Sequence, residues 1–121
     1  MVYVSNLAIE PPQLSWKEDG ITVFEQNYTS VRLQCILEKG NPKPDFSWFR
    51  NNEPLHPVNN ENPNCNTVRD GFYFAGNNKQ EVVICGTPLR YEDYSGIYTC
   101  RARNSEGEDE ISTSLKILGK S

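Results

Sequence analysis

The chain contains almost no histidine, and it also lacks most of the residue sets from which enzyme sites are built. His56 is the only histidine among 121 residues, and the sequence around it offers no Ser-His-Asp, Cys-His or multi-ligand set. The four cysteines follow one another at intervals of 30, 20 and 15 residues, which excludes the close Cys-x-x-Cys pairs of a zinc site. No glycine-rich phosphate loop occurs. We therefore expect no enzyme, no metal and no cofactor, and we interpret His56 as a solvated loop residue.

The chain also lacks an excess of positive charge and any long apolar run. Its 12 Lys and Arg against 16 Asp and Glu give a net charge of −4, which disfavours nucleic acid, heparin or an anionic membrane as a partner. No run approaches the roughly 18 apolar residues of a membrane-spanning helix. The start, Met1–Ser5, has no basic segment followed by an apolar one, so we expect no signal peptide here and a domain excised from a longer protein.

An acidic run near the C-terminus is the remaining candidate for binding a cation. Alternation along a strand would divide its side chains between two faces, which is unsuitable for a cation site. We therefore expect a solvated hairpin for these residues: Glu106, Glu108, Asp109 and Glu110.

Short segments with an apolar residue at every second position are what the chain does contain. In 30–37, Val31, Leu33 and Cys35 fall on one side, the pattern of a half-buried strand. Further strands are expected at 21–24, 45–50, 55–57, 67–75, 81–85, 96–103 and 111–117, separated by turns and by the Asn-rich loop 59–66. Pro11-Pro12 suits the start of an edge strand. We predict an all-β, two-sheet Greek-key fold over residues 11–118, with 1–10 as a leader or added edge segment and 119–121 as a tail.

The spacing of four residues carries a resemblance to a known fold. Trp48 lies 13 residues after Cys35, Cys100 lies 65 residues after it, and Tyr98 stands two residues before Cys100. This pattern resembles the signature of an immunoglobulin-like sandwich. The resemblance implies a Cys35–Cys100 disulfide between the sheets, Trp48 packed on it, and the Tyr98 hydroxyl bound to the preceding turn. Such a disulfide contributes about 3–5 kcal/mol.

Further motifs narrow the resemblance. The stretch Gly40–Asn51 and the run Asp93-Tyr94-x-Gly96-x-Tyr98-x-Cys100 are similar to those of I-set immunoglobulin domains in neural adhesion molecules. The Ala102-Arg103-Asn104 segment followed by Gly107, and Pro11-Pro12, are most similar to the first domain of neurofascin-like and neuroglian-like proteins. The resemblance implies adhesion at the cell surface, with neighbouring immunoglobulin domains and a partner that is a copy of the chain or a relative.

A second pair of cysteines departs from that pattern. If Val82 and Ile84 fill the core side of their strand, Cys85 points outward. Cys65 enters the antiparallel neighbour of that strand, so the two Cα atoms could come within disulfide range. We predict a Cys65–Cys85 disulfide that holds the Asn-rich loop against the sheet. Two unpaired thiols, or pairing between chains, are the alternatives.

The compartment follows from the cysteines and one sequon. Asn27-Tyr28-Thr29 meets the rule for N-glycosylation at Asn27, and an even cysteine count suits an oxidising compartment. We expect an extracellular domain of a membrane protein that binds another protein. The alternatives are a receptor ectodomain for a soluble ligand, and a structural I-set spacer of an intracellular, muscle-type giant protein.

One face of the expected fold has the composition of a binding site. Phe49 lies on the outer side of its strand, and the sheet also bears Arg101 and Arg103. An aromatic side chain flanked by arginines is typical of an interface hot spot. We predict that Phe49, Arg101 and Arg103 form the binding face; the alternative is that Phe49 only packs over a neighbouring strand.

Overall fold

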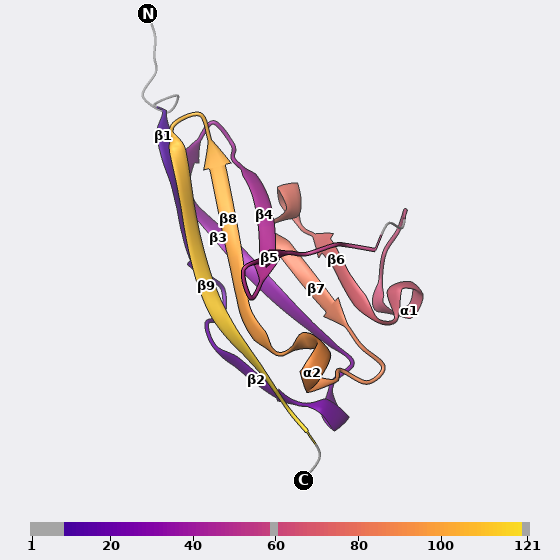
Figure 1. The fold of residues 1–121 in the computed structure, drawn as a ribbon. Helices are drawn as coiled ribbons and strands as arrows, with labels where there is room; N and C mark the ends of the chain where they lie inside the picture. Colours follow the sequence, from indigo (N-terminus) through magenta and orange to yellow (C-terminus); the bar gives the residue numbers. More distant parts are fainter. Residues whose placement is uncertain (1–8, 59–60, 120–121) are drawn as a thin grey trace, which may run out of the picture.

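Two β-sheets packed face to face form the molecule (Figure 1). The computed structural model describes residues 9–58 and 61–119. Residues 1–8 of the expected leader, 59–60 of the Asn-rich loop and 120–121 of the expected tail lie outside the described residues. Within the described ranges, no helix has the length and apolar character needed to cross a membrane.

The first sheet has four strands, all antiparallel to their neighbours. In spatial order they are β1 (Glu10–Trp16), β3 (Ser30–Asn41), β7 (Glu81–Cys85) and β6 (Gly71–Ala75). The second sheet has five strands, in the order β2 (Ile21–Phe24), β9 (Gly107–Leu118), β8 (Gly96–Asn104), β4 (Asp45–Arg50) and β5 (Glu53–Pro54). Only β2 runs parallel to its neighbour, β9. The prediction of an all-β, two-sheet sandwich is confirmed.

The core lies between the sheets and follows the predicted alternation. Inward side chains of the four-stranded sheet include Val31, Leu33, Cys35, Val82 and Ile84, all buried. Those of the five-stranded sheet include Phe46, Trp48, Tyr98, Cys100, Ala102, Leu115 and Ile117. At roughly 1.5–3 kcal/mol for each large apolar side chain, this layer is the main source of folding energy.

The N-terminal segment passes from the first sheet to the second between β1 and β2. Gly20 makes the turn with φ of 74°, and its N–H donates to Thr113 Oγ1 at 2.8 Å. That hydroxyl donates in turn to Asp19 Oδ1 at 2.7 Å. Farther along β9, Asp109 Oδ2 accepts from the Leu14 N–H of β1 at 2.8 Å. Side chains thus fasten both halves of the segment to β9.

The strand predicted at 67–75 is wrong in its first half. Residues Cys65–Val68 form a one-turn helix, α1, and only Gly71–Ala75 form strand β6. Asn64 explains the helix: its Oδ1 accepts from the Thr67 N–H at 3.1 Å, while Thr67 Oγ1 accepts from the Asn64 N–H at 3.2 Å. This reciprocal cap satisfies backbone donors at the start of the helix. Arg69, with φ of 66°, ends the helix.

Smaller corrections concern other boundaries. Strand β3 runs on to Asn41, beyond the predicted end at Leu37, because Asn41 pairs with Glu10 of β1. The short strand expected at 55–57 lies earlier, at Glu53–Pro54, where it pairs with Phe49 and Arg50. The crossover 86–94 contains a second one-turn helix, α2 (Tyr91–Tyr94). The predictions for 21–24, 45–50 and 81–85 are confirmed.

Candidate functional site

The outer face of the five-stranded sheet brings Phe49 and Arg101 together. The two residues lie on the adjacent strands β4 and β8, where Ser47 pairs with Arg101 and Phe49 with Thr99. They are therefore diagonal neighbours on one face. The Arg101 Cζ lies 4.4 Å from the centroid of the Phe49 ring, a cation–π contact that contributes roughly 0.5–1 kcal/mol at an exposed site.

Strand β9 supplies an acidic partner for each arginine. Arg101 Nη2 lies 3.0 Å from Glu110 Oε2, and Arg103 Nη2 lies 2.9 Å from Glu108 Oε1. Exposed pairs of this kind add little to stability, but they hold both guanidinium groups in place. The face is therefore not a free basic patch, and the sequence did not predict this pairing.

A small cleft opens beside the arginines. Its volume is about 220 Å³, and it is lined by Asp45, Phe46, Ser47, Arg101 and Arg103. That is below the roughly 300–1,000 Å³ of a small-molecule site, but it suits a single side chain of a protein partner. Arg101 Nε is buried and has no hydrogen-bond acceptor in the described part of the chain.

The aromatic anchor is less exposed than the sequence suggested. Phe49 is half-buried because Arg101 covers its ring. Ile97 of β8 is an exposed apolar side chain on this outer face, at 48%. Ile97 alternates along the sequence with Arg101 and Arg103 on the same side of the strand, so the signal was present in the sequence. The two arginines, Phe49 and Ile97 are called the front face below.

The geometry implied by the resemblance is present at the four signature residues, Cys35, Trp48, Tyr98 and Cys100. Cys35 and Cys100 form a disulfide with a Cα–Cα distance of 6.5 Å. Trp48 is buried, and its Nε1 donates to the Lys79 carbonyl at 2.8 Å. The Tyr98 hydroxyl donates to the Tyr94 carbonyl of α2 at 2.6 Å. Burial of that hydroxyl raises the pKa of Tyr98 well above its usual range, because the charged phenolate would lose its hydration.

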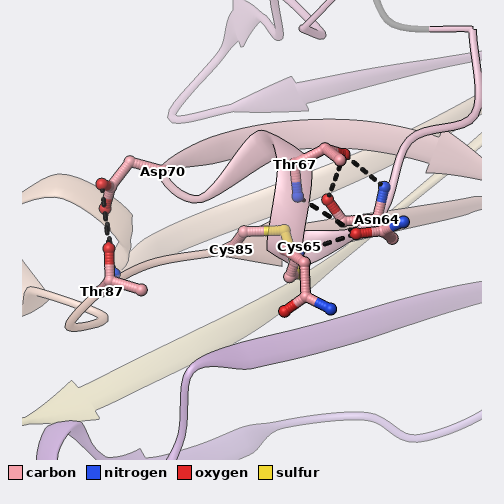
Figure 2. Close-up of a disulfide and its surroundings, with 7 residues drawn as sticks. Asn64, Cys65, Thr67, Asp70, Cys85 and Thr87 are labelled. Atoms are coloured by element: carbon pink, nitrogen blue, oxygen red, sulfur yellow. Dashed lines mark hydrogen bonds between the residues drawn. A yellow bond between two sulfur atoms is a disulfide. The ribbon is translucent and has the colours of Figure 1, made fainter.

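The second disulfide, between Cys65 and Cys85, is also present, with a Cα–Cα distance of 5.4 Å. Figure 2 shows it joining α1 to the end of β7. Cys85 points away from the main core, as predicted, yet it is fully buried because Val68 of α1 and Val83 pack around it. The disulfide thus sits in a second, small apolar cluster on the outer side of the four-stranded sheet.

The remaining candidates lie apart from the front face. Asn27 ends a 3₁₀ turn after β2 and is exposed. His56 is exposed beside a cleft of about 190 Å³ that Arg50, Glu53 and Phe72 also line. The acidic run divides between faces as expected, since Glu108 and Glu110 meet the arginines while Asp109 bonds to β1. Among residues 9–58 and 61–119, no three His, Cys, Asp or Glu side chains are grouped closely enough to hold a metal ion.

Comparison with known proteins decides the family. A model of the immunoglobulin domain family matches residues 11–104, a range that contains both disulfides, Trp48 and Tyr98. The chain belongs to the immunoglobulin family. This immunoglobulin domain resembles parts of much larger proteins. Several of these proteins are named as receptors or adhesion molecules.

Three relatives illustrate the kinds of protein that contain a similar domain. Fibroblast growth factor receptor-like 1 of Gallus gallus is 31% identical over 90 residues, 74% of this chain and 15% of that protein. Junctional adhesion molecule B of Homo sapiens is 32% identical over 79 residues, covering 65% and 24% of the two chains. Titin of Drosophila melanogaster is 32% identical over 113 residues, 93% of this chain and, after rounding, 0% of titin. The immunoglobulin domain thus spans a minor part of each relative.

A solved structure agrees on the fold. The M4 domain of titin superposes with a TM-score of 0.66 at 15% identity, covering 88% of this chain and 95% of that domain. At this identity the likeness shows the immunoglobulin sandwich alone.

Proposed function

We propose that this immunoglobulin domain is extracellular and binds another protein through the front face. The observation that carries the proposal is the Arg101 guanidinium held over the Phe49 ring beside the small cleft. Aromatic and arginine side chains are enriched among the residues that dominate binding energy. Because Glu110 and the ring fix the guanidinium before binding, little side-chain entropy is lost on association.

The cell surface is the compartment that we propose. Both disulfides favour an oxidising environment, and the receptor and adhesion relatives agree with it. Within that setting, the motifs at 40–51 and 93–107 support a place among the first domains of neurofascin-like and neuroglian-like adhesion molecules. Binding to a copy of the chain, to another adhesion protein or to a soluble ligand would all use the same face.

The test is a double substitution, Phe49→Ala with Arg101→Ala. Beads coated with the chain would be assayed for aggregation, and labelled tetramers of the chain would be applied to an array of purified cell-surface ectodomains. We expect the double variant to lose at least about tenfold in affinity for whichever probe binds, since hot-spot truncations cost about 2 kcal/mol or more.

A matched control lies on the opposite sheet. Arg32 and Tyr73 are both aligned with Val83, on the outer side of β3 and β6, so Arg32→Ala with Tyr73→Ala removes an arginine and an aromatic away from the front face. This control should bind as the parent chain does. Equal binding by the parent and the Phe49/Arg101 variant would refute the front face as the binding site.

A spacer within a giant intracellular protein is the second candidate, favoured by the similarity to Drosophila titin over 93% of the chain. Such a domain would carry load between neighbours and would not need its thiols oxidised. The redox state of the four cysteines in the native protein separates the two candidates.

A further inference from the structure

The one sequon of the chain begins three residues after an exposed aromatic residue, Phe24. Strand β2 ends at Phe24, and Glu25–Asn27 form a 3₁₀ turn. Phe24 precedes this turn in extended conformation, with ψ of 132°, and Asn27 follows it by three residues. The turn therefore keeps the exposed Asn27 close along the chain to the exposed Phe24. Its side-chain amide makes no hydrogen bond within the described part of the chain.

The surface around Asn27 is unusually apolar for an exposed site. Phe24 and Tyr28 are each 48% exposed, and Leu118 is 41% exposed. Phe24 and Leu118 are paired across the parallel strands β2 and β9, so their side chains lie together on the outer face of the sheet. Three large apolar side chains are thus exposed near the end of β2, where the sequon begins.

The strand beneath this patch has an open edge. Within the described residues, β2 pairs with β9 on one side and with no strand on the other. Its four residues, Ile21–Phe24, carry no charge, and charge is one of the features that prevent edge strands from pairing with other chains. Beside this edge runs a groove of about 470 Å³, lined by β2, Tyr28 and the first residues of β3.

We propose that Asn27 carries an N-linked glycan whose first sugar packs on the Phe24 ring and covers the open edge of β2. The apolar face of a sugar ring and the face of an aromatic ring are complementary surfaces, and only the short 3₁₀ turn separates Asn27 from Phe24. A glycan is bulky and solubilising, which compensates for the charge that the edge lacks. The inference rests on the extracellular placement proposed above.

The attachment follows the ordinary chemistry of a sequon. The Asn27 Nδ2 forms a bond to the anomeric carbon of the first N-acetylglucosamine and gives up a proton. The bond from that carbon to the diphosphate of a lipid-linked oligosaccharide breaks, and the lipid diphosphate departs. Thr29, two residues after Asn27, supplies the hydroxyl that the sequon requires.

Occupancy is tested first. The chain would be secreted from animal cells behind an added signal peptide, and its intact mass would be measured before and after treatment with peptide N-glycosidase. We expect nearly every molecule to lose the mass of one glycan, and the Asn27→Gln variant to lose none. A secreted, folded parent chain without a glycan would refute the proposal.

Packing on Phe24 is tested by thermal unfolding of glycosylated and enzymatically deglycosylated samples. We expect the glycan to raise the Tm of the parent chain by about 3 °C, the order of shift produced by one good contact in a domain of this size. Phe24→Ala should abolish this gain. Ile97→Ala should retain it, because Ile97 is equally exposed, at 48%, but lies on β8.

An equal gain in the Phe24→Ala variant would show a glycan that does not touch the ring, and the packing would be wrong. Failure here is distinguishable from failure of the front face. Front-face binding is measured with Phe49 and Arg101, which lie on β4 and β8, and glycan occupancy is measured by mass without any partner. A protein partner that binds only the Asn27→Gln variant would instead make this patch an uncovered docking surface and overturn the glycan's role.

Discussion

At the scale of single residues, Tyr98 shows how a core side chain fixes a loop. Its ring is fully buried between the sheets, while its hydroxyl donates to the Tyr94 carbonyl in α2. The bond orders the crossover that leads into β8. Removal of the hydroxyl leaves a buried carbonyl without a donor, which costs more than the bond alone contributes.

We expect Tyr98→Phe to lower the free energy of unfolding by about 1–2 kcal/mol in urea titrations at neutral pH. The variant should also change how the free energy of unfolding depends on pH in alkaline solution. Burial raises the pKa of Tyr98 above the value of 10.0 for an exposed tyrosine, so the unfolded chain releases its proton first as the pH rises. Tyr98 therefore stabilises the fold fully below about pH 10, and this contribution is lost above it.

In the parent chain the loss should reach about 1.4 kcal/mol per pH unit from Tyr98 alone. For Tyr98→Phe, the free energy of unfolding should fall less steeply with pH above pH 10. Burial also raises the pKa of Tyr94, so Tyr94 accounts for part of the pH dependence that remains in the variant. Parallel slopes for the two proteins would contradict the burial of an uncharged Tyr98 hydroxyl.

At the scale of elements, the disulfide at Cys65 and Cys85 holds α1 on the four-stranded sheet. Besides the disulfide, α1 contributes chiefly Val68 to the outer apolar cluster. A hydrogen bond from Thr87 N–H to Asp70 Oδ1, at 3.0 Å, ties the following turn to the segment after β7 (Figure 2). We infer that α1 depends on the disulfide far more than the main core does.

The matching experiment is Cys65→Ala with Cys85→Ala. For a closed loop of 20 residues, chain entropy predicts a loss of about 3 kcal/mol in the free energy of unfolding. We also expect faster tryptic cleavage at Arg69, which is exposed directly after α1. The fluorescence of Trp16 and Trp48, which pack on each other in the main core, should remain native-like because the Cys35–Cys100 core is separate. A native-state tryptophan spectrum that matches the unfolded chain would show that the two clusters are not independent.

The sequence predicted the elements whose side chains alternate over a full strand, and missed those set by local capping. The strands at 30–37, 45–50 and 96–103 show clear period-two patterns and could be predicted from them, while the roles of Cys35, Trp48 and Tyr98 were implied by the resemblance to the immunoglobulin signature. Helix α1 could not, because four residues are too few for a helical period and its cap depends on Asn64 within an Asn-rich run. The ion pairs of Arg101 and Arg103 were missed because they require the β8–β9 register, in which Arg101 is opposite Glu110.

At the scale of the whole molecule, the redox state of the four cysteines in the native protein distinguishes the proposed extracellular role from the intracellular alternative. The native protein, isolated from its own cells under conditions that block thiol exchange, would be treated with a thiol-alkylating reagent without reductant and weighed intact. We expect no added label, since the structure holds no free cysteine among its described residues. Addition of four labels to a folded chain would instead favour the intracellular spacer.

The strand arrangement also determines how the domain responds to tension. The start of β1 and the end of β9 lie at opposite poles (Figure 1), and the last residues of β9 run parallel to β2. Tension between the poles therefore slides β2 along β9 and loads their hydrogen bonds together. If these strands separate, the Cys35–Cys100 disulfide, which spans 65 positions, stops further extension. Less than half of the 121 residues could then be drawn out, so an oxidised domain would lengthen under tension only up to a fixed limit.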